Sequence, residues 1–155
     1  MIPLLPFSYW TIFTSLSPED AAQILQVRVG ERPFLKWGLK KNHWSFEGRV
    51  SPSGFNISRS IIGINSFLPV IYGNFTPEQG RLRVEIVAMI HPFVIVFMIV
   101  FFAGLYSASG GTGQSLPGLV VFVLVFWAIS QTIFLYELNR AKVFFNETFQ
   151  FYKIA

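Results

Sequence analysis

Residues 91–108 read HPFVIVFMIVFFAGLYSA, and residues 116–136 read LPGLVVFVLVFWAISQTIFLY. No charged residue lies between Glu85 and Glu137. Each stretch has a length within the roughly 17 to 25 residues that a helix needs to cross a bilayer core. The uncharged segment between them, SGGTGQS at 109–115, favours a turn. The sequence therefore predicts a transmembrane hairpin of two helices, with spans at about 91–108 and 116–136.

The composition of the whole chain agrees with a membrane protein. Hydrophobic residues make up 52% of its 155 residues and charged residues only 13%, about half of what an average soluble domain carries. So few charges cannot cover a water-exposed surface unless much of the chain faces lipid. The chain has no cysteine, which excludes a disulfide, a thiolate nucleophile and a sulfur-ligated metal.

The segment before the first span has the pattern of a soluble, β-rich domain. Ser17-Pro18 followed by two acids predicts a helix over 18–27, because serine is a preferred N-cap and proline suits the first helical position. A weakly alternating first strand is expected over 9–15. Further strands are expected over 44–51, 55–59, 66–76 and 81–90, joined as an antiparallel meander.

Alternation also predicts which side chains this sheet buries. The expected buried face comprises Trp44, Phe46, Val50, Phe55 and Ile57. His91-Pro92 is expected to end the last strand, since proline cannot continue a ladder. Residues 86–90 could belong either to this strand or to the first span, and we favour the strand.

The domain organisation follows from these segments. We expect a soluble β-rich domain at 1–90, the hairpin at 91–136, and a helical tail at 137–155 that packs on the sheet domain. The fold class is α+β: an antiparallel β-meander with a short N-terminal helix, plus a transmembrane hairpin that continues into a C-terminal helix.

Signs of catalysis or of a bound cofactor are weak. The chain has only two histidines, His43 and His91, and neither has a metal-ligand spacing. No phosphate loop, dinucleotide fingerprint or serine nucleophile elbow is present. We therefore predict no enzyme activity, no catalytic residue, no metal and no cofactor. His91 lies near Glu85, and this pair could relay protons, although an interfacial polar residue is the favoured interpretation.

One segment mixes cations with large aromatic rings, and it is the candidate membrane-surface contact. Cations close to anionic headgroups and tryptophans at the interface both favour such a contact. The alternative is a solvated loop whose tryptophans enter the core, and no nucleic-acid partner is expected. The candidate residues are Lys36, Trp37, Lys40, Lys41 and Trp44.

Small and polar residues within the spans are candidates for interhelical packing. Gly104 and Ala108 are small residues four apart, a spacing that lets helices approach closely. Gln131, between Ser130 and Thr132, is expected to hydrogen-bond across the hairpin or to a second copy, because an unpaired amide in hydrocarbon is costly.

Several motifs resemble a family of small uncharacterised bacterial membrane proteins. The motifs are FEGRV at 46–50, FNISR at 55–59, NSFLPVIYG at 65–73 and HPF at 91–93. The resemblance implies two spans and a cytoplasmic β-rich part, with no known activity. From element order alone, a helix-grip or bacterial pleckstrin-homology-like fold is the nearest familiar shape.

The expected function is a membrane-anchored, non-enzymatic binding or scaffold module at the cytoplasmic membrane surface. The alternatives are a protein that binds lipid or another hydrophobic ligand, and an accessory subunit of a membrane complex. Expected partners are the bilayer, anionic headgroups, and a protein partner or second copy. Cations near the two span ends predict an inner-membrane protein with both termini cytoplasmic. They are Arg81, Arg83, Arg140 and Lys142.

Overall fold

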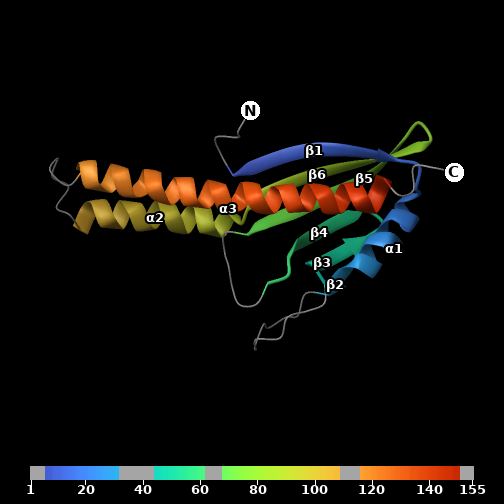
Figure 1. The fold of residues 1–155 in the computed structure, drawn as a ribbon, viewed down its shortest axis with the longest axis horizontal. Coiled ribbons are helices and arrows are strands. Elements are labelled where there is room, and N and C mark those ends of the chain that lie inside the picture. Colours follow the sequence, from blue (N-terminus) through green and yellow to red (C-terminus); the bar gives the residue numbers. More distant parts are fainter. Residues whose placement is uncertain (1–5, 32–43, 62–67, 109–115, 151–155) are drawn as a thin grey trace.

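The computed structural model describes residues 6–31, 44–61, 68–108 and 116–150 as an α+β fold with a six-stranded mixed sheet and three helices. Figure 1 shows α2 and the first half of α3 at one end of the molecule, and the sheet beside the second half of α3 at the other. The elements are β1 (Phe7–Thr14), α1 (Pro18–Arg28), β2 (Val29–Glu31), β3 (Phe46–Ser51), β4 (Gly54–Arg59), β5 (Pro69–Glu78), β6 (Arg81–Ile90), α2 (Pro92–Ala108) and α3 (Leu116–Gln150).

The sheet has the strand order β1-β6-β5-β4-β3-β2. Strands β3 to β6 form the expected antiparallel meander, and β6 extends to Ile90, which confirms the strand interpretation of residues 86–90. Two pairings extend it. β1 lies antiparallel to β6 at one edge, and β2 lies parallel to β3 at the other. The sheet is therefore mixed, because α1 carries the chain from one edge to the other.

Helix α1 begins and ends close to where the sequence places it. The Ser17 hydroxyl accepts a hydrogen bond from the backbone N–H of Asp20 at 3.1 Å, and proline occupies the first turn. The side chains of Ala21, Ala22 and Leu25 are buried in the core. The helix thus covers part of the sheet's apolar face.

The second half of α3 supplies the rest of that cover. Its buried side chains recur every three or four residues, the spacing of one helix face. They are Phe134, Leu138, Ala141, Phe145 and Phe149. The Phe145 ring stacks on Phe55 of β4 at 5.1 Å between centroids, and Phe144 lies 4.6 Å from Phe46 of β3. Aromatic rings in direct contact therefore fill the space between α3 and the centre of the sheet.

A glycine in β5 makes this ring packing possible. A Cβ atom built on Gly73 would lie 2.1 Å from the ring of Phe55, so only glycine leaves room for that ring above the strand. Phe55 can then reach both Phe75 and Phe145. Gly73 belongs to the motif NSFLPVIYG, and the packing gives a physical reason for its identity.

The predicted buried face of the sheet is largely correct, with one error. Phe46, Phe55 and Ile57 are buried and Val50 is partly buried against the core. Trp44, in contrast, is 44% exposed. It precedes β3, which begins at Phe46, so the strand alternation does not extend to it.

The two predicted spans differ in length. One helix among the described residues, Pro117–Phe149, is long and apolar enough to cross a membrane, and 11% of its most apolar window is buried. Helix α2 is apolar but has 17 residues, so length and composition alone do not support a two-helix transmembrane hairpin. The expected second span and the described part of the tail, as far as Gln150, are one continuous helix, α3.

Candidate membrane interface

Helix α2 and the first half of α3, here called the apolar hairpin (92–108 and 116–136), expose large apolar side chains. Phe93 is 69% exposed, Val100 66% and Val121 60%. Single exposed apolar residues are normal on a soluble protein, but a continuous apolar surface marks contact with lipid or protein. Other exposed side chains of the hairpin are Ile95, Val96, Phe97, Ile99, Phe101, Leu105, Tyr106, Val120, Phe122, Leu124, Val125, Trp127, Ile129 and Tyr136.

One stripe of α2 faces α3 instead. Val94, Met98 and Phe102 are the buried or partly buried residues of α2, and they recur every four residues. The Phe102 ring contacts Phe122 at 6.0 Å and Phe126 at 6.1 Å. The helices run in opposite directions (Figure 1). Since Phe102 contacts Phe122 and Phe126 and the rise per residue is equal, Pro92 lies about level with Phe134. Where α2 begins, α3 thus passes from the hairpin into the core of the sheet.

An ion pair lies at this junction. The guanidinium of Arg59, at the end of β4, donates to Oε1 of Glu137, the first charged residue of α3. The Glu137 side chain is only 8% exposed and that of Arg59 27%. A carboxylate removed from water needs such a partner, so the pair ties the end of the apolar stretch to the sheet.

Close to the junction, two cationic side chains of α3 lie beside aromatic rings. The guanidinium carbon of Arg140 is 5.0 Å from the centroid of Tyr136, and the Lys142 ammonium is 5.4 Å from the Trp10 ring. Both distances suit a cation–π contact. Aromatic rings and cations near the end of an apolar span are typical of a membrane–water boundary.

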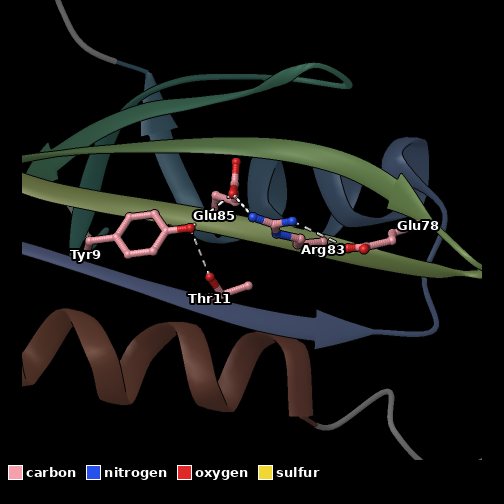
Figure 2. A network of polar contacts seen from close by, with 5 residues as sticks. All are labelled: Tyr9, Thr11, Glu78, Arg83 and Glu85. Atoms are coloured by element: carbon pink, nitrogen blue, oxygen red, sulfur yellow. Dashed lines mark hydrogen bonds and ion pairs between the residues drawn. The ribbon is translucent and has the colours of Figure 1, made fainter.

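A polar network lies on the opposite face of the sheet, away from α3 (Figure 2). The Tyr9 hydroxyl donates to Glu85 at 3.0 Å and accepts from Thr11 at 3.3 Å, while Arg83 pairs with Glu85 and with Glu78. The Tyr9 phenol and, after it, the Glu85 carboxylate raise the pKa of Arg83. An arginine guanidinium is charged at any physiological pH, so the network holds a permanent cation.

Most of the predicted membrane-surface residues lie outside the described part of the chain. They are Lys36, Trp37, Lys40 and Lys41. Trp44 is described, and its side chain covers Gly30 of β2: a Cβ atom on that glycine would lie 2.5 Å from the indole. Trp44 is thus partly exposed and partly packed against the edge of the sheet.

The predicted interhelical residues occupy different surroundings. Gly104 and Ala108 are exposed, and a Cβ atom on Gly104 would meet nothing within 4 Å among the described residues. Gly104 and Ala108 therefore do not lie at a close contact between α2 and α3. Gln131 is buried, near the junction. Its neighbours Ser130 and Thr132 donate to the carbonyls of Phe126 and Ala128, four residues back in the same helix, and not across the hairpin.

His91 caps α2. Its Nδ1 accepts from the backbone N–H of Phe93 at 3.2 Å, and its carbonyl accepts from Val94 at 2.9 Å. Glu85, in turn, bonds to Tyr9 and Arg83. The side chains of His91 and Glu85 therefore bond to other groups and not to each other, and no direct contact supports the proton-relay alternative.

Sequence reasoning missed the residues that join the parts of the fold. Arg59 and Glu137 are 78 positions apart, and Tyr9 and Glu85 are 76 apart. The isolated charge at the end of a long apolar run was the one available signal for Glu137, but nothing in the sequence named its partner.

Within the described ranges, no three histidine or acidic side chains cluster in a way that could hold a metal ion. Comparisons with family models, with curated proteins and with solved structures each found no match.

Proposed function

We propose that the chain is a membrane-anchored, non-enzymatic docking module, held by the apolar hairpin with its sheet at the cytoplasmic surface. The observation that carries this proposal is the continuity of α3. Its first half exposes apolar side chains, and its second half forms the core of the sheet domain. A helix shared by anchor and domain fixes their relative position, as a binding or scaffold module requires.

The same proposal includes two crossings of the bilayer. At about 1.5 Å per residue, α2 is about 25 Å long, close to the roughly 30 Å of a hydrocarbon core. If α3 alone crossed, the exposed side chains of α2 would face water. A second crossing buries them in lipid, and local thinning of the bilayer accommodates the short helix at modest cost.

The ligand-binding alternative is less favoured by the packing. A hydrophobic ligand between sheet and helix would need space where Phe145 stacks on Phe55 and Phe144 lies against Phe46. The role of accessory subunit in a membrane complex is compatible with this packing, since a docking module can be part of a larger assembly.

Carbonate extraction of membranes tests the anchor. The full-length chain is expected to stay in the membrane pellet, and its release into the soluble fraction would contradict the proposal. A variant that introduces charge into the middle of the exposed surface, Val100→Arg together with Val125→Arg, should lower insertion, because each charge at mid-bilayer costs about 2.5 to 3.5 kcal/mol. Glu19→Arg, on α1, serves as the matched control and should insert normally.

A further inference from the structure

Strand β1 has an outer backbone edge that pairs with no other strand in the described part of the chain. The N–H of Ile90 donates to the carbonyl of Pro6, which makes these two residues a hydrogen-bonded pair. Such pairs alternate along an antiparallel ladder, so the even-numbered residues of β1 bond to β6. The odd-numbered ones, Phe7, Tyr9, Thr11 and Phe13, direct their N–H and C=O groups away from the sheet. No described strand pairs with them.

The β1 edge also lacks the features with which proteins discourage pairing. Its sequence, FSYWTIFT, has no charge and no proline, and its register with β6 runs unbroken over all eight residues, without a bulge. The opposite edge is different. There β2 has only three residues and ends in Glu31, and a short or charged edge is a poor template.

A second copy of this chain does not suit the edge. This step rests on the proposed function, in which all copies share one bilayer orientation. β1 runs along the long axis of the molecule beside α3 (Figure 1), so two anchored copies present β1 in the same direction. A symmetric antiparallel pair is then impossible. A symmetric parallel pair would set N–H opposite N–H and C=O opposite C=O.

The side chains around the edge define the chemistry of a better occupant. On the outer face, Phe7, Tyr9 and Phe13 are about half exposed, and they favour aromatic or β-branched neighbours across the strands. On the inner face lie Trp10 and, over its ring, the Lys142 ammonium. The indole nitrogen of Trp10 is buried and has no acceptor among the described residues. A carboxylate on this side of an added strand would complement Lys142.

We propose that the β1 edge binds an extended segment of a different protein by strand addition. This segment has aromatic or β-branched residues at alternate positions and an acidic residue on the side that faces α3. Backbone hydrogen bonds supply the affinity, and the alternating side chains supply the selectivity.

The test uses the full-length protein in the membranes of its own cells, with a photo-crosslinking phenylalanine analogue at Tyr9 or Phe13. The control carries the analogue at Tyr72, on the same face of the sheet but on the inner strand β5. The expected result is a discrete adduct from the β1 positions alone, mapped by mass spectrometry to an extended segment of another protein. Thr11→Pro should reduce the adduct at least tenfold, because it removes an outward N–H without breaking a bond to β6.

Folding and anchoring are checked separately. Thr11→Pro should keep the circular dichroism spectrum and the membrane location of the parent chain, whereas Ile12→Pro removes a β6 bond and should unfold the edge. If the Thr11→Pro variant unfolds, the test uses the variant Thr11→Lys instead, which places a charge on the edge.

Three results would overturn the strand-addition proposal: no adduct, an adduct to a second copy, or an adduct that persists in the folded Thr11 variant. Membrane retention in those cases would leave the proposed anchor intact.

Discussion

The guanidinium of Arg59 and the carboxylate of Glu137 join the sheet to the helix that leaves the apolar hairpin. The carboxylate is nearly buried, so its charge depends on this one described partner. Removal of one member of a buried pair costs more than replacement of both by apolar groups, because the remaining charge is left without compensation.

We therefore expect Arg59→Met to lower the free energy of unfolding by roughly 2 to 3 kcal/mol, somewhat less than for a fully buried pair because Arg59 is partly exposed. The double variant Arg59→Met, Glu137→Leu should recover most of that loss. Thermal or denaturant unfolding in detergent micelles measures both. Equal losses in the single and double variants would show that the loss does not come from an uncompensated Glu137 carboxylate, and no loss in Arg59→Met would show that the pair does not stabilise the junction.

The aromatic core between sheet and α3 leads to a second prediction. Phe46→Ala should lower the free energy of unfolding by about 3 to 5 kcal/mol, since its buried ring contacts Phe144. Phe97→Ala, on the exposed face of α2, removes the same atoms from a site that is 54% exposed and should cost less than about 1 kcal/mol in micelles. A loss below 1 kcal/mol for Phe46→Ala would mean that this face is not the core.

Local patterns predicted much of this fold. Alternation and turn residues gave the β3–β6 meander, and the N-cap signal gave α1 within one residue at its end. The edge pairings were missed for a physical reason. β1 pairs with a strand more than 65 residues later in the chain, and β2 is three residues long with no alternation to detect. Such contacts depend on the assembled sheet, not on any local pattern.

The candidate site was predicted less well. Composition identified the apolar hairpin and its charge-free length, because a long run without charged residues is a strong signal in the sequence. Small residues at Gly104 and Ala108 suggested close packing, yet in the structure Val94, Met98 and Phe102 face α3. Helix rotation decides which stripe meets the partner helix, and an almost uniformly apolar sequence carries little information about rotation.

The free edge of β1 predicts an alternating pattern of amide exchange. In the unbound protein, the N–H groups of Phe7, Tyr9, Thr11 and Phe13 should exchange with solvent at least tenfold faster than those of Ser8, Trp10 and Ile12, which bond to β6. Amide exchange followed by NMR in micelles resolves the residues individually. Uniform protection along β1 would mean that its outer edge is already covered.

Contact with anionic headgroups stays a prediction for Lys36, Lys40 and Lys41. In nanodiscs with anionic lipid, the tryptophan emission of the full-length protein should lie further to the blue than in neutral nanodiscs, and high salt should remove the difference. Replacement of the three lysines by glutamine should likewise remove the difference in emission between anionic and neutral nanodiscs. Arg49→Gln, on β3, is the control and should leave the shift unchanged. A shift insensitive to both salt and the lysines would favour a solvated segment.

The membrane topology is the remaining prediction, with both termini cytoplasmic and residues 109–115 on the far side. Cations close to the ends of spans are retained in the cytoplasm, and the structure places Arg140 and Lys142 within three turns of the level at which α2 begins. The connecting segment carries no charge that could oppose them.

A cysteine at Thr112 should therefore react with an impermeant maleimide in intact cells. A cysteine at Ser53, in the turn between β3 and β4, should react only after lysis. Labelling of Ser53→Cys in intact cells would reverse the orientation, and protection of Thr112→Cys would remove the far-side loop and the second crossing with it.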